Sequence, residues 1–136
     1  MIKIIAGNKG SGKTKRLIDL TNQTAKDAIH DVVFIDDDNR YMFDLRHEVR
    51  FVNAGEYGMR SADMFFGFLC GMLASNYDIS TIFVDAFLKL VKIDVAESGW
   101  FFESLESYGK KHDVTFVLSV SADPEALPEF CKSYVI

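Results

Sequence analysis

Cysteine and clustered basic residues are both scarce in this chain. Only two cysteines occur among 136 residues, Cys70 and Cys131, and neither belongs to a Cys-x-x-Cys pair or has a histidine at zinc-ligand spacing. A disulfide framework and a zinc site are therefore not expected, and the pattern indicates two buried free thiols in a reducing compartment. The 15 lysines and arginines form no long run, and the net charge is −5. Because nonspecific nucleic-acid binding needs clustered positive charge, a nucleic-acid partner is not expected.

Long apolar segments are missing as well. The most apolar stretch covers residues 64–74, whereas crossing a bilayer takes about twenty residues. Residues 1–6 are too few to form the apolar region of a signal peptide, so we expect a cytoplasmic protein without a membrane partner. Hydrophobic residues are nevertheless abundant, at 49% of the chain with 12 phenylalanines. This content suffices for one densely packed domain over residues 1–136.

The most informative pattern present is the glycine-rich segment at residues 7–14, which reads Gly-Asn-Lys-Gly-Ser-Gly-Lys-Thr. A β-branched run at residues 2–6 precedes it and predicts a strand, and apolar residues at helical spacing from residue 13 to about 29 predict a helix. Glycines between a strand and a helix let backbone N–H groups turn toward an anion at the helix N-terminus, where the helix dipole favours negative charge. The segment is therefore predicted to bind phosphate.

A second motif is the apolar run at residues 81–84, which ends in Asp85. Together the two motifs (GNKGSGKT and TIFVD) resemble the Walker A and Walker B motifs of the P-loop NTPase superfamily. The resemblance implies that Lys13 and Asp85 are catalytic, that Thr14 and Asp85 hold Mg²⁺, and that ATP or another nucleoside triphosphate is the ligand. The nucleotide contacts that it implies are Gly7, Asn8, Lys9, Gly10, Ser11, Gly12, Lys13, Thr14 and Lys15.

Two narrower resemblances are fainter. In the additional-strand, RecA-like branch of the superfamily a polar sensor residue lies at a strand end, and Ser119 or Ser121 is similar to it. The opening through Thr14 also resembles cytosolic thymidine kinases, although their zinc-binding cysteines and the acid that follows the Walker B aspartate are absent here.

The order of expected elements predicts an α/β fold, a three-layer α/β/α arrangement with a mainly parallel sheet of about five strands. Expected strands lie at residues 2–6, 32–36, 49–52, 81–85, 114–119 and 133–136. Expected helices lie at residues 13–29, 38–45, 61–75 and 97–112, with a further short one opened by residues 123–125; residues 87–95 fit either a helix or a strand. Because ligands of parallel sheets bind beyond the carboxyl ends of the strands, the glycine loop, residues 36–38, Asp85, Ser119 and Ser121 should share one rim.

The residue that follows Asp85 departs from the pattern of many ATP-hydrolysing relatives. A glutamate that orients the attacking water is common there, and this chain has Ala86 instead. Hydrolysis is therefore expected to be slow or to depend on a partner. Asp36, Asp37 or Asp38 could serve as the base, although three acids after a strand more often form a solvated turn and helix cap. The guanine-reading Asn-Lys-x-Asp motif is absent, which favours adenine.

Three functions remain open from the sequence. The first is a nucleotide-binding NTPase, activated by a protein partner or by forming a homo-oligomer, with Arg40, Arg60, Lys89 and Lys92 as candidate charge-stabilising residues. The second is a kinase for a small molecule or a nucleoside, in which only residues 53–60 could close over the phosphates. The third is a nucleotide sensor without turnover.

Overall fold

The computed structural model describes residues 1–136 and contains five strands and five α-helices. The strands are β1 Ile2–Gly7, β2 Asp31–Asp36, β3 Arg50–Asn53, β4 Ile79–Val84 and β5 Thr115–Ser121. The helices are α1 Lys13–Asp27, α2 Ala62–Ser75, α3 Phe87–Val91, α4 Gly99–His112 and α5 Glu129–Lys132. Four short 3-10 turns complete the chain: η1 Met42–Asp44, η2 Ala54–Tyr57, η3 Val95–Glu97 and η4 Pro124–Ala126.

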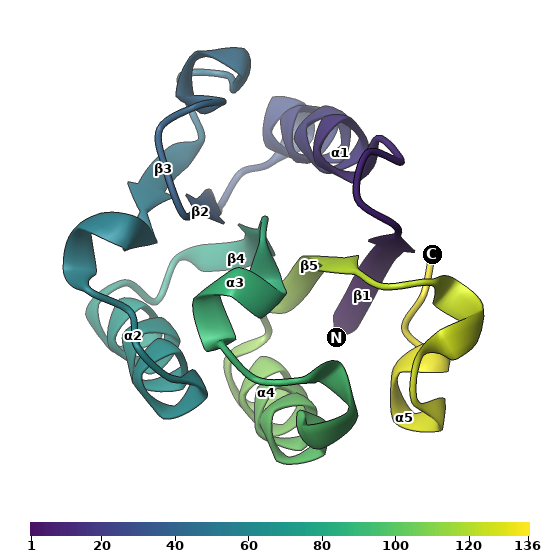
Figure 1. The fold of residues 1–136 in the computed structure, drawn as a ribbon. Coiled ribbons are helices and arrows are strands. Elements are labelled where there is room, and N and C mark those ends of the chain that lie inside the picture. Colours follow the sequence, from purple (N-terminus) through teal and green to yellow (C-terminus); the bar gives the residue numbers. More distant parts are fainter.

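All five strands are parallel and form one sheet in the order β1-β5-β4-β2-β3 (Figure 1). The last strand, β5, is inserted between β1 and β4. The register places Gly7 beside Ser121 and Ile35 beside Val84, so the carboxyl ends of the strands meet at one rim. The predicted α/β class and the predicted parallel five-stranded sheet are confirmed.

Helices cover both faces of the sheet, which explains why its strands are almost continuously apolar. Side chains alternate along each strand: Val33 and Ile35 of β2 belong to the larger core cluster, and Val32 and Phe34 belong to the smaller one. The larger cluster lies under α2, α3 and α4, and the smaller one lies under α1, as the arrangement in Figure 1 shows. The molecule therefore has three layers, with α1 on the face opposite α2 and α4. None of the helices has the length and apolar character that a membrane crossing requires.

The two longest predicted helices before residue 80 are present, with one error at an end. Helix α2 begins after Ser61, whose hydroxyl accepts the Met64 N–H at 3.1 Å, as expected for an N-cap. Helix α1 ends at Asp27, two residues earlier than predicted, and Ile29 is 89% exposed. The apolar spacing continued to Ile29, but the chain must leave the helix there to enter β2, so the periodicity overran the true end.

Two predicted elements are wrong. Residues 38–45 do not form a helix capped by Asp38, because Asp38 Oδ1 instead accepts the Arg40 N–H at 2.8 Å and closes a local turn before the short η1. Residues 133–136 form no strand beyond a single parallel bridge between Val135 and Ile4. Two hydrogen bonds hold this segment to β1, from the Ile4 N–H to the Tyr134 carbonyl at 2.8 Å and from the Ile136 N–H to the Ile4 carbonyl at 2.9 Å.

Three smaller expectations are also settled. The ambiguous segment from residue 87 forms the five-residue helix α3, followed by η3. Helix α4 begins at Gly99, two residues later than predicted, and buries Phe101 and Phe102 but leaves Trp100 42% exposed. Both cysteines are free thiols as expected, but only Cys131 is buried, since Cys70 is partly exposed.

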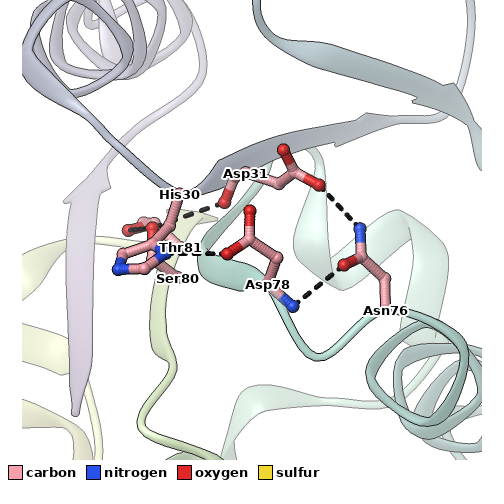
Figure 2. A network of polar contacts seen from close by, with 6 residues as sticks. All are labelled: His30, Asp31, Asn76, Asp78, Ser80 and Thr81. Carbon is pink, nitrogen blue, oxygen red and sulfur yellow. Dashed lines mark hydrogen bonds and ion pairs between the residues drawn. The ribbon is translucent and has the colours of Figure 1, made fainter.

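A polar network joins the amino ends of β2 and β4, whereas the glycine loop lies at the carboxyl ends of the strands (Figure 2). His30 Nδ1 lies 2.8 Å from Asp78 Oδ1, and Asn76 Nδ2 donates to Asp31 Oδ2 at 2.8 Å. The Asp78 N–H donates to Asn76 Oδ1 at 2.9 Å, and the Ser80 hydroxyl donates to the Asp31 carbonyl at 3.3 Å. These contacts align two neighbouring strands where the β2–β4 pairing is irregular.

Candidate phosphate-binding site

The glycine loop between β1 and α1 has a backbone that side chains would disrupt. Gly10 and Gly12 have φ of 85° and 87°, in the left-handed region that favours glycine. Gly7 is closely packed, because a Cβ at this position would lie 2.4 Å from Ser11 Oγ and 3.2 Å from Ser11 Cβ, so the Ser11 side chain would have to move. Glycine is therefore favoured at positions 10 and 12 by the backbone angles and at position 7 by close packing against Ser11.

The lysine side chains of the loop take different directions. Lys13 Nζ donates to the Asn8 carbonyl at 3.2 Å, so its charge lies across the loop at the N-terminus of α1. Lys15 pairs with Asp19 one turn along the exposed face of α1, at 3.2 Å. Lys9 is exposed on the loop. Of the predicted basic contacts, Lys13 is thus the side chain held against the loop backbone.

Asp85 follows β4 and is brought against the start of α1. Its Oδ2 accepts the Thr14 hydroxyl at 3.0 Å, although the two residues are 71 positions apart in the chain. Its Oδ1 accepts the Ser119 hydroxyl at 2.5 Å, and the Ser119 oxygen in turn accepts the Ala86 N–H at 3.1 Å. Asp85 is 6% exposed. The arrangement fixes both carboxylate oxygens and aims one of them at the Thr14 hydroxyl.

The expected meeting of strand ends at one rim is therefore observed, and it separates the two candidate serines. Ser119 of β5 is buried and contacts Asp85, whereas Ser121 is exposed beside Gly7. The side chain of Ser119 lies on the same face of the sheet as that of Val117, which packs under α1. Ser121 lies two positions further along the same strand and therefore on the same face, so alternation could not have distinguished the two serines; they differ because Ser121 is the last residue of β5.

Asp36 departs most from its expected environment. It was expected in a solvated turn, but it is the last residue of β2 and is 2% exposed. Its Oδ1 accepts the Asp37 N–H at 2.7 Å, whereas Oδ2 is buried without a hydrogen-bond partner. Burial raises the pKa of the Asp36 carboxyl to about 8, and the carboxyls of Asp37 and Asp85 act in the same direction. Asp36 therefore holds a proton at neutral pH in this environment.

The alternation of buried residues in β2 explains this burial. Val32 and Phe34 point into the core under α1, and Asp36 continues the same period. The period was visible in the sequence, but the three consecutive acids suggested a turn that began one residue too early.

The segment after Asp85 is strained. Ala86 and Lys92, which flank α3, both have φ of 56°, a conformation that residues with a side chain adopt rarely. Ala86 occupies the position at which many ATP-hydrolysing relatives have a glutamate, and its N–H donates a hydrogen bond to the Ser119 hydroxyl. The structure therefore offers no carboxylate at position 86, and the carboxylate of the adjacent strand end is Asp36.

A cavity of about 520 Å³ lies beside this rim, between η2 and α3. Its lining residues are Asp37, Gly55, Gly58, Met59, Leu88, Lys89, Leu90 and Lys92. The exposed Lys89 of α3 and Lys92, which follows this helix, thus line a cavity that Asp37 also lines. Of the other candidate charge-stabilising residues, Arg40 pairs with Asp38 at 3.3 Å and Arg60 is exposed.

No protein-family model and no curated protein sequence matches this chain. Among solved structures, it is similar to domain III of the replication initiation protein DnaA from Thermotoga maritima, with 18% sequence identity and a TM-score of 0.48. The alignment covers 98% of this chain and 50% of that structure, so this chain spans about half its length. This degree of similarity adds nothing to the assignment of a function, which rests on the geometry of the rim.

Proposed function

We propose that the rim formed by the glycine loop, Thr14 and Asp85 binds a nucleoside triphosphate, with ATP as the favoured ligand. One observation carries the proposal: Thr14 at the start of α1 and Asp85 after β4 meet at 3.0 Å beside a loop of glycines with left-handed backbone. Backbone N–H groups at a helix N-terminus, together with the Lys13 charge, suit the phosphate chain. The hydroxyl–carboxylate pair suits the cation that accompanies it.

The oxygen donors at this point fit Mg²⁺. Thr14 Oγ1 and Asp85 Oδ2 converge, both are hard oxygen ligands, and Ser119 fixes the orientation of the carboxylate from its other side. When bound, Mg²⁺ neutralises charge on the phosphate oxygens. Thr14 and Asp85 would hold it, and Lys13 would contact the β- and γ-phosphates.

We propose further that hydrolysis by the isolated protein is slow, or requires a protein partner or a second copy of the chain. Ala86 has no group that could orient a water, and the arginine side chains that form hydrogen bonds do so away from the glycine loop and Asp85. Phosphoryl transfer depends on orienting the nucleophile and on neutralising charge that develops on the γ-phosphoryl group. A partner that supplies an arginine would complete the site.

Calorimetric titration of the full chain with ATP, GTP and dTTP, each with and without Mg²⁺, tests this proposal. Wild type is expected to bind ATP most tightly, and only with Mg²⁺ at full affinity. Lys13→Ala should weaken ATP binding by about 1.5–3 kcal/mol, because a charge-assisted contact is lost.

Lys26→Ala is the matched control, since Lys26 lies in the last turn of the same helix, away from the loop. It should bind ATP as wild type does. Unchanged ATP affinity in Lys13→Ala, or equal losses in the two variants, would exclude the loop as the phosphate site.

A second candidate function is phosphoryl transfer to a small acceptor. The observation that favours it is the cavity of about 520 Å³ on the same rim, lined by Asp37, Lys89 and Lys92. A lysine pair and a carboxylate there suit an acceptor with both anionic and hydroxyl groups. Acceptor-dependent conversion of ATP to ADP, abolished by the double variant Lys89→Ala/Lys92→Ala, would distinguish this function from partner-stimulated hydrolysis.

A further inference from the structure

We propose that the acidic turn at the carboxyl end of β2, formed by Asp36, Asp37 and Asp38, binds a divalent cation without any nucleotide. One carboxylate oxygen from each residue lies within 4.8 Å of the other two. Oxygen ligands at this spacing suit hard cations such as Mg²⁺, Mn²⁺ or Ca²⁺. The site is distinct from the Thr14–Asp85 oxygen pair and does not depend on phosphate binding at the glycine loop.

The buried oxygen of Asp36 is the observation that points to a ligand. Asp36 is 2% exposed, its Oδ1 accepts the Asp37 N–H, and its Oδ2 has no hydrogen-bond partner. Buried polar atoms without a partner are uncommon, because they lose hydration and gain nothing in return. None of the ion pairs in the structure involves Asp36 or Asp37. A cation would supply the missing partner.

The fold holds the backbone of this turn in place. Asp36 is paired within the sheet beside Asn53 of β3. A Cβ at Gly55 would lie 2.4 Å from the carbonyl oxygen of Asp37, so η2 packs directly on the turn and only glycine fits there. Asp37 and Gly55 also line the cavity beside α3, so this turn can be approached from solvent at Asp37. The backbone of the turn is thus fixed by packing.

Arg40 limits the third ligand. Asp38 Oδ1 accepts the Arg40 N–H at 2.8 Å, and Asp38 Oδ2 accepts Arg40 Nη2 at 3.3 Å. This ion pair is exposed, so it is weak and can open. The guanidinium nevertheless competes with a bound cation for Asp38. Removing its charge should therefore tighten cation binding, a change that a purely structural acidic turn would not produce.

The test titrates the nucleotide-free full chain with MnCl₂ and counts free Mn²⁺ by electron paramagnetic resonance. We expect one site filled below about 1 mM. Asp36→Asn and Asp37→Asn should each weaken binding by at least about tenfold, because each removes a carboxylate ligand; at Asp36 the cation binds by displacing the proton. Arg40→Gln should tighten it. Asp19→Asn, which removes an exposed carboxylate on α1, is the matched control and should leave binding unchanged.

A second measurement locates the ion. Bound Mn²⁺ broadens the NMR signals of nearby amides, so those of Asp37–Arg40 and Gly55 should disappear before those of Gly10–Thr14.

Asp37 is only half-buried, so the Asp37→Asn variant keeps the substitution test decisive if Asp36→Asn fails to fold. The proposal is overturned if wild type binds no Mn²⁺ at about 1 mM, if Asp85→Asn weakens binding as much as Asp36→Asn, or if broadening centres on the glycine loop. All of these results are obtained without nucleotide, so they stand whether or not the loop binds ATP.

Discussion

At the scale of single residues, the rim contrasts two carboxyl groups at the ends of neighbouring strands. Asp85 has a hydroxyl donor on each oxygen, from Ser119 and from Thr14. Asp36 has a backbone N–H on one oxygen and nothing on the other. The same side-chain chemistry therefore serves as an oriented acceptor in one strand and as an uncompensated buried acid in the next.

Asp85→Asn is predicted to reduce the affinity for ATP more in the presence of Mg²⁺ than in its absence. A carboxylate that holds the metal contributes only when the metal is there, whereas an amide keeps the shape of the side chain. Calorimetric titrations with Mg²⁺ and with excess chelator give the two losses. Equal losses would identify Asp85 as a residue that only positions the start of α1 through Thr14.

Asp36 makes stability depend on pH in a defined direction. Its pKa is raised from 3.8 to about 8 in the folded chain, so between these values the folded state holds a proton that the unfolded state has released. The contribution is complete below pH 3.8 and is lost as pH rises through about 8. The loss from this one group is about 1.4 kcal/mol per pH unit while the two states differ by a full proton.

Asp36→Asn should therefore remove a downward slope in the free energy of unfolding, because the amide resembles the protonated acid and does not titrate. Urea unfolding of wild type and variant between about pH 5 and about pH 8 measures the difference. The variant should gain stability relative to wild type as pH rises. Parallel curves would show that Asp36 ionises in the folded state as it does in the unfolded chain.

At the scale of elements, two helical glycines lie in opposite surroundings. A Cβ at Gly67 in α2 would meet no atom within 4 Å, so Gly67→Ala should raise the free energy of unfolding by about 0.5–1 kcal/mol. A Cβ at Gly109 in α4 would lie 2.9 Å from the Val114 carbonyl oxygen and 3.1 Å from the Met1 nitrogen. Gly109→Ala should lower the free energy of unfolding by about 1–3 kcal/mol.

Chemical denaturation of both variants, with Gly71→Ala as a second open position in α2, separates the helix-propensity effect from the packing effect. A stabilised Gly109→Ala would contradict the close approach of α4 to the amino end of the chain. A destabilised Gly67→Ala would show instead that the exposed face of α2 is covered in solution.

Elements were predictable from the sequence where a strong period and a specific signal coincided. The strand before the glycine loop, the capped helix after Ser61 and the parallel class all follow from such coincidences. The errors lie where a local pattern was decided by distant contacts. Asp36 is buried because α1 covers its face of the sheet. The segment at Val135 pairs with β1 at one bridge only, because the Tyr134 and Val135 N–H groups bond back to Cys131 and Lys132 of α5.

At the scale of the whole molecule, the isolated protein is predicted to turn over triphosphate at about 10⁻⁴ to 10⁻² per second, the range of comparable folds without an activating partner. The reasons are Ala86 after Asp85 and the absence of an arginine side chain that is hydrogen-bonded at the glycine loop or at Asp85. The rate is measured by assaying the inorganic phosphate that the isolated protein releases from ATP in the presence of Mg²⁺. A turnover above about one per second that disappears in Lys13→Ala would mean that the chain already contains a complete catalytic set.

The insertion of β5 between β1 and β4 has a consequence for how the molecule folds. The glycine loop is encoded within the first residues, yet β1 has no strand neighbour until β5 is available. During synthesis, β2, β3 and β4 can pair with one another while β1 waits, and the loop and α1 have no finished edge to rest on. Contacts this distant in sequence slow folding, because the intervening chain must be closed into a loop first. We therefore expect the glycine loop, although first in the sequence, to be among the last parts of the protein to reach its folded form.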